Sequence, residues 1–276
     1  MRIITTSLML LLLITSNIIS YADKAALPKH QPVPGGVAVI KLDWQHRSRP
    51  EAYFNNEPLL MAQLNDQWYA LAGIALGIKP GNHHIQVNEP NGTTVKYPVT
   101  VKAKKYPAQY LKIKNRRYVE PEKKDVDRIL REKDEISELL ATFTPDTAGY
   151  YRFTKPVNGR LSSRFGLKRF FNGKPRRPHS GLDIAAKRGA RVSAPLSGRV
   201  IGIGNYFFSG NIIFLDHGQG MISTYSHLNS VKVKPGQEVK TGDLLGEVGS
   251  TGRVTGPHLH WSVYLNRTRV DPSLFL

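Results

Sequence analysis

The chain of 276 residues contains no cysteine. This absence excludes a disulfide framework, a thiol nucleophile and a lipid attached through an N-terminal cysteine. A chain of this length can bury two modest cores without covalent cross-links, so ordinary packing must hold the fold. Any chemistry must therefore depend on side chains other than thiols.

Acidic residues are also scarce, since 21 Asp and Glu stand against 39 Lys and Arg and give a formal net charge of +18. From residue 156 onward, 17 basic residues face 6 acidic ones. Such an excess can serve solubility, but it favours attraction to a polyanion outside the cytoplasm. Because no basic helix with interleaved aromatic residues occurs, we predict association with an anionic wall or membrane surface, and no nucleic-acid partner.

The longest hydrophobic run lies in the first residues, MRIITTSLMLLLLITSNIISYA. Arg2 precedes an apolar run at residues 8–14, and the small residues Ser20 and Ala22 follow where a signal peptidase would cut. The run is too short and too interrupted for a comfortable membrane span. We therefore predict that residues 1–22 are a secretory signal peptide, with an uncleaved anchor as the alternative. The protein is then exported, and is periplasmic or associated with the cell envelope.

The remaining pattern is mainly β. Short alternating segments such as GVAVIKLD and TVKYPVTVK recur between turn-forming residues. They predict a β-sandwich-like N-terminal domain over residues 23–118, with a tether at its start. Residues 119–150 place apolar residues at helical spacing and predict a helical linker. Strand-like segments separated by glycines return in residues 151–276 and predict a second domain of antiparallel sheets.

Two motifs in this C-terminal domain contain residue types that bind metals. PHSGLDIAA places His179 four residues before Asp183, and TGPHLHW contains His258 and His260. Zinc accepts imidazole and carboxylate ligands, and three protein ligands with one open position form a catalytic zinc site. Strand alternation puts both histidines of HxH on one face, about 6.5–7 Å apart, so one can bind metal while the other reaches a metal-bound water. His227, at the end of MISTYSHL, is a further candidate for the same cleft.

The motifs occur in order within HSGLDIAA, GNIIFLDHGQGMISTYSHL and VKPGQEVKTGDLLGEVGSTGRVTGPHLHW. With their glycine framework, residues 156–276 resemble the LytM/lysostaphin-type zinc endopeptidases of bacterial cell walls. The segment from PVPGGVAVIKL to about Leu111 resembles the N-terminal β domain found ahead of some members. The resemblance implies that the C-terminal domain is an antiparallel β-sheet peptidase domain with a narrow groove.

The resemblance also implies roles for the five candidate residues. His179, Asp183 and His260 would bind one zinc ion per chain. His227 and His258 would be catalytic. Some relatives are degenerate activators that have lost zinc ligands, whereas this chain retains all of these residues.

We therefore predict a zinc-dependent endopeptidase that hydrolyses peptide cross-links of bacterial peptidoglycan by attack of a zinc-activated water. Two alternatives stay open, a non-catalytic wall-binding activator of another hydrolase and a general secreted protease. Zinc content distinguishes the activator from an enzyme, and cleavage of casein identifies the general protease. A further hypothesis is that the N-terminal domain and the linker cover the groove until they are displaced, for example by a regulatory protein partner. The alternative is that these segments position the enzyme on its substrate or a partner.

Overall fold

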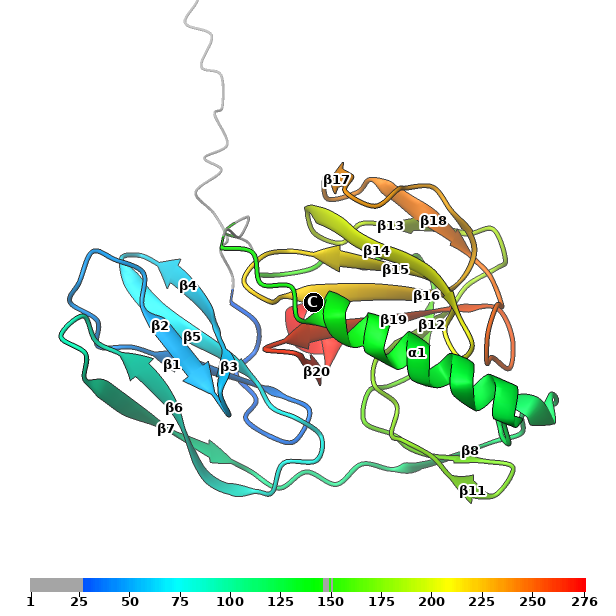
Figure 1. Ribbon diagram of the computed structural model, residues 1–276, viewed down its shortest axis with the longest axis horizontal. Helices are drawn as coiled ribbons and strands as arrows, with labels where there is room; N and C mark the ends of the chain where they lie inside the picture. Colours follow the sequence, from blue (N-terminus) through cyan, green and yellow to red (C-terminus); the bar gives the residue numbers. More distant parts are fainter. Residues whose placement is uncertain (1–26, 146–148, 150) are drawn as a thin grey trace, which may run out of the picture.

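The computed structural model of the protein describes residues 27–145, 149 and 151–276, so the predicted signal peptide lies outside the described residues. The fold is mainly β, as predicted, and its described part contains one α-helix. Figure 1 shows the N-terminal strands in blue and cyan beside the larger C-terminal sheet in yellow, orange and red. None of the described helices combines the length and apolar character that a membrane crossing requires.

Two small antiparallel sheets form the N-terminal part, with strand orders β1-β5-β4 and β3-β2-β6-β7. Their strands are β1 (Val37–Lys41), β2 (Glu51–Phe54), β3 (Glu57–Pro58), β4 (Leu60–Leu64), β5 (Gln67–Gly73), β6 (Gly81–Asn88) and β7 (Thr94–Val101). Phe54, Met61 and Ile85 come from both sheets and lie in one buried core. This packing confirms the sandwich-like prediction.

A ten-stranded antiparallel sheet forms the C-terminal part, in the order β17-β14-β15-β16-β19-β12-β9, with β13, β18 and β20 attached. Its strands are β9 (Arg160–Ser163), β12 (Leu182–Ala185), β13 (Arg191–Ser193), β14 (Gly198–Tyr206), β15 (Gly210–Asp216), β16 (Ile222–Val231), β17 (Glu238–Val239), β18 (Leu244–Val248), β19 (His258–Leu265) and β20 (Thr268–Val270). The 3-10 helix η2 (Pro272–Phe275) follows. The order of strands places β12, β19 and β16 side by side, which joins the two histidine motifs.

The segment between these parts contains β8 (Ala108–Leu111), the 3-10 helix η1 (Arg116–Tyr118) and helix α1 (Lys123–Leu140). Strand β8 pairs in parallel with β10 (Lys168–Phe171), which also pairs with β11 (Lys174–Pro175). Helix α1 crosses the large sheet in Figure 1 and packs on β14, where a Cβ at Gly202 would lie only 2.6 Å from Leu139. The missing side chain at Gly202 thus permits the close approach of the helix.

The N-terminal and C-terminal parts share buried contacts. The side chain of Asn266 accepts a hydrogen bond from the Gly73 N–H at 2.6 Å and donates one to the Gly73 carbonyl at 3.1 Å. Gln219 forms the same pair of bonds with the backbone of Met61, at 2.9 and 3.2 Å. Because both side chains are buried, these bonds fix the position of the N-terminal sheets on the large sheet.

Candidate metal centre

Strand register brings together the two motifs that the sequence singled out. Asp183 on β12 lies directly opposite His260 on β19, and Ala185 lies opposite His258. Residues two apart on a strand point to the same face, so His258 and His260 share the face that Asp183 occupies. His179 precedes β12, where its backbone N–H donates to the Leu167 carbonyl at 2.9 Å.

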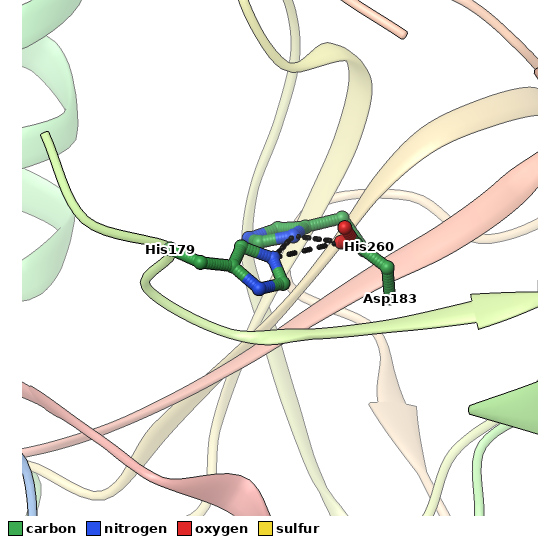
Figure 2. A group of neighbouring side chains, drawn as sticks. All are labelled: His179, Asp183 and His260. Atoms are coloured by element: carbon green, nitrogen blue, oxygen red, sulfur yellow. Dashed lines mark hydrogen bonds and ion pairs between the residues drawn. The ribbon is translucent and has the colours of Figure 1, made fainter. Parts of the chain in front are cut away.

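Three side-chain atoms converge on one point. The Nε2 atom of His179 lies 2.9 Å from Asp183 Oδ1 and 3.1 Å from Nδ1 of His260. The same Oδ1 lies 2.7 Å from His260 Nδ1. Figure 2 shows the two rings and the carboxylate turned toward one another. These three atoms are therefore close enough to share one ion, since all lie within 4.8 Å of one another.

The outer ring nitrogens decide which atoms face this point. His179 Nδ1 lies 2.6 Å from the Arg164 carbonyl, which can only accept, so Nδ1 carries the hydrogen and Nε2 presents a lone pair. His260 Nε2 lies 3.0 Å from Ser262 Oγ, and a hydrogen there leaves the lone pair of Nδ1 pointing inward. Three electron-pair donors at 2.7–3.1 Å repel one another unless a proton or a metal ion lies among them. Two imidazoles and a carboxylate are a donor set that suits zinc.

The electrostatics of Asp183 and His260 favour the forms that bind metal. Burial opposes ionisation of Asp183, but the imidazoles of His179 and His260 outweigh it and hold the pKa of the carboxyl well below its usual range. Burial lowers the pKa of His260 to about 4, although Asp183 acts in the opposite direction. Near pH 7 the carboxylate is thus charged and the His260 ring is neutral. Arg169 donates to the second carboxylate oxygen, Asp183 Oδ2, at 2.6 Å and orients the group.

His227 reaches the site through a β-bulge. Tyr225 pairs with Ile213 while Leu228 pairs with Asn211, so β16 holds one extra residue at this point. The extra residue gives His227 a φ of 67°. The bulge turns its ring toward β19, where the ring centre lies 4.8 Å from that of His258 and 5.9 Å from that of His260.

His227 and His258 are both oriented by backbone carbonyls. Nδ1 of His227 donates to the Thr251 carbonyl, and Nδ1 of His258 to that of Gly256, each at 2.8 Å. Both Nε2 atoms therefore carry lone pairs, and that of His258 lies 3.7 Å from Asp183 Oδ1. Burial, together with the neighbouring histidines, lowers the pKa of His227 well below its usual value. Its ring is then neutral near pH 7 and can accept a proton.

The five residues selected from the sequence thus lie in one cluster. Three of them, His179, His227 and His260, line a groove of about 990 Å³, which Ile129 and Ile136 of α1 also line. Arg169 and the carbonyl and hydroxyl partners of the rings could not be identified from the sequence. Arg169 lies ten residues before His179, and the HxxxD motif does not indicate that it reaches Asp183.

Comparison with protein families gives two matches. The model of peptidase family M23 matches residues 177–272, and that of the peptidase family M23 N-terminal domain matches residues 30–102. A crystal structure of an M23 protein from Pseudomonas aeruginosa superposes with a TM-score of 0.76 at 40% identity, and covers 89% of this chain and 95% of that protein's chain.

The curated relatives that match part of the chain include two named endopeptidases. The peptidoglycan DD-endopeptidase ShyA of Vibrio cholerae is 36% identical over 123 residues, which are 44% of this chain and 29% of ShyA. The DD-carboxypeptidase/endopeptidase Mpg of Neisseria meningitidis is 36% identical over 124 residues, which are 45% of this chain and 29% of Mpg. The chain thus spans less than a third of the length of these curated relatives.

Proposed function

Because the chain belongs to peptidase family M23, we propose that it is a zinc-dependent endopeptidase that hydrolyses peptide cross-links of bacterial peptidoglycan. The observation that carries this proposal is the convergence of His179, Asp183 and His260 on one point, with two further histidines beside them and a groove that His179 and His260 line. The endopeptidase names of ShyA and Mpg support the choice of peptidoglycan as substrate.

In this proposal His179, Asp183 and His260 hold one zinc ion through Nε2, Oδ1 and Nδ1. When bound, zinc supplies positive charge that polarises a peptide carbonyl and makes water a nucleophile near neutral pH. The outer contacts to Arg164 and Ser262 hold both rings in the tautomers that present these atoms.

His227 and His258 act on protons in this proposal. Each presents an Nε2 lone pair beside the three ligands, so each can take a proton from the attacking water and return it to the leaving amine. A protonated ring can also stabilise the developing oxyanion. We expect removal of either ring to lower the rate about 10²–10³-fold.

The test uses purified full-length protein and purified sacculi, with mass spectrometry of the released muropeptides. Wild type should release cleaved cross-links and contain about one zinc per chain, whereas Asp183→Ala should lose both properties. His258→Ala should keep its zinc but cleave about 10²–10³-fold more slowly. If zinc-loaded wild type leaves sacculi unchanged and His258→Ala behaves identically, the proposal is wrong. Absence of zinc together with activation of a separate amidase would instead identify an activator, and cleavage of casein a general protease.

Further proposals concern location and the rest of the chain. We propose that residues 1–22 direct export to the periplasm or cell envelope, where the net charge of +18 favours an anionic surface. We also propose a division into an N-terminal β domain (23–118), a helical linker (119–150) and the peptidase domain (151–276). In this scheme α1 limits access of substrate, because it forms one wall of the groove, and a partner protein that displaces it would activate the enzyme.

A further inference from the structure

The groove that His179, His227 and His260 line is strongly basic. Among the described residues that line it, seven are Lys or Arg and one, Glu132, is acidic. The Glu132 carboxylate is already engaged, because it accepts hydrogen bonds from the backbone N–H of Phe207 and from Arg128. A groove of this charge attracts an anionic ligand and repels a cationic one.

One of these basic residues, Arg253, lies against two aromatic rings. Its guanidinium lies 4.7 Å from the centre of the Phe171 ring and 4.3 Å from that of Phe208. Its backbone N–H donates to the Phe208 carbonyl at 2.9 Å, which fixes the loop on the same wall of the groove. The two rings therefore hold the guanidinium by cation–π contacts and limit its rotation.

The positive charge of Arg253 has no acidic partner in the described part of the chain, since none of the ion pairs there includes it. Burial, followed by the charges of Arg169 and Arg176, lowers its pKa to about 10, so it is still protonated at neutral pH. The Arg169 guanidinium donates to the Asp183 carboxylate, and Arg176 donates to two backbone carbonyls. A partly dehydrated cation among like charges is unfavourable until an anion binds.

We propose that Arg253, with Arg169 and Arg176 beside it, forms a carboxylate-binding subsite that selects peptides with a free carboxylate near the scissile bond. A planar guanidinium binds a carboxylate through two parallel N–H···O bonds, which a carboxamide cannot accept in the same way. The subsite rests on the proposed endopeptidase function, because Arg253 lines the same groove as His227 and His260.

The test compares two synthetic cross-linked peptides of identical sequence, one with free carboxylates and one with carboxamides in their place. Zinc-loaded full-length wild type should cleave the carboxylate peptide with a kcat/KM about ten- to a hundredfold higher. Arg253→Gln should lose most of this preference, because its kcat/KM on the carboxylate peptide falls toward the value on the carboxamide peptide. Arg253→Lys keeps the charge but not the planar fork, so it should retain part of the preference.

Arg199→Gln is the matched control. It removes the same charge from an exposed position on β14 that faces Glu238 and does not line the groove, and should leave the preference unchanged. Thermal melting shows whether each variant is folded. Equal cleavage of both peptides by wild type, or an equal loss on both in Arg253→Gln, would overturn the subsite while the proposed function stands.

A wild type that cleaves neither peptide refutes the proposed function but still leaves the subsite open to test. Binding of both peptides is then measured by titration calorimetry on wild type and on Arg253→Gln. Tighter binding of the carboxylate peptide that is lost in Arg253→Gln supports the subsite. Equal binding of the two peptides to wild type overturns it.

Discussion

Gly181 lies between the proposed ligands His179 and Asp183, just before β12. Its replacement by alanine tests how closely the loop at residues 179–181 must approach β19. A Cβ at this position would lie 2.4 Å from the backbone oxygen of Trp261 and 2.9 Å from Cε1 of the His260 ring. The first of these atoms belongs to the backbone of a central strand and cannot rotate away. The segment 179–183, which holds two of the three proposed ligands at the start of β12, must move instead.

The size of this movement sets the expected effect of Gly181→Ala. Ordinary Cβ contacts lie beyond 3.0 Å, so the loop must shift by about 0.6–1 Å. Overpacking of this kind typically costs about 1–3 kcal/mol of stability, and a misplacement of ~1 Å in an active site can lower the rate about 10²-fold. We therefore expect zinc affinity to fall at least about tenfold and release of muropeptides to fall about 10²-fold, with the fold retained.

Gly256→Ala is the control for this experiment. Gly256 also lies just ahead of a site histidine, His258, but a Cβ there would meet no atom within 4 Å. Zinc affinity is measured by competition with a chromophoric chelator, cleavage by mass spectrometry of muropeptides, and stability by unfolding in urea. If Gly181→Ala binds zinc and cleaves sacculi as well as Gly256→Ala does, close contact between the loop and β19 does not determine the geometry of the site.

Three further perturbations test the fold and the access to the groove. Asn266→Ala leaves the buried N–H and carbonyl of Gly73 unpaired, so it should lower the free energy of unfolding in urea by about 2–4 kcal/mol. A loss below about 0.5 kcal/mol would contradict a stabilising role of these two hydrogen bonds. Burial lowers the pKa of His217 to about 4, below the ordinary value of 6.5, so the unfolded chain binds the proton first and stability should fall by about 3 kcal/mol between pH 6.5 and pH 4. His217→Gln should make the free energy of unfolding in urea depend less steeply on pH over that range, and an unchanged slope would refute the assignment. Leu139→Asp should loosen α1 from Gly202 and raise the rate of muropeptide release if α1 limits access, whereas an unchanged or lower rate in a folded variant argues against that limit.

Part of the fold could be predicted because alternation marks a buried face at the start of β19, although the central strands β15 and β16 are buried on both faces. In HLHWSVYL, Leu259, Trp261 and Val263 are fully buried, as alternation requires. The small sheet of β8, β10 and β11 was not predicted. Its parallel pair joins segments about 60 residues apart, and no local pattern specifies a partner at that distance.

The residue types of the candidate site could be selected from the sequence, but not their mutual positions. The spacing of HxH specifies that His258 and His260 share a face, because strand geometry is local. The placement of Asp183 opposite His260 depends on the register between β12 and β19, which the fold as a whole determines. Arg169 reaches Asp183 from β10, a strand that depends in turn on its pairing with β8.

The position of the His227 ring depends still more on tertiary structure. A φ of 67° costs a residue other than glycine about 1–3 kcal/mol, so a regular strand would be preferred if β16 were considered alone. The bulge persists because the His227 N–H donates to the Ser209 carbonyl at 2.9 Å and Nδ1 donates to the Thr251 carbonyl at 2.8 Å. Bonds of this kind contribute about 0.5–1.5 kcal/mol each, which is comparable to the strain. Since Ser209 lies in the turn before β15 and Thr251 in the loop after β18, the ring reaches the site only once these strands have assembled around β16.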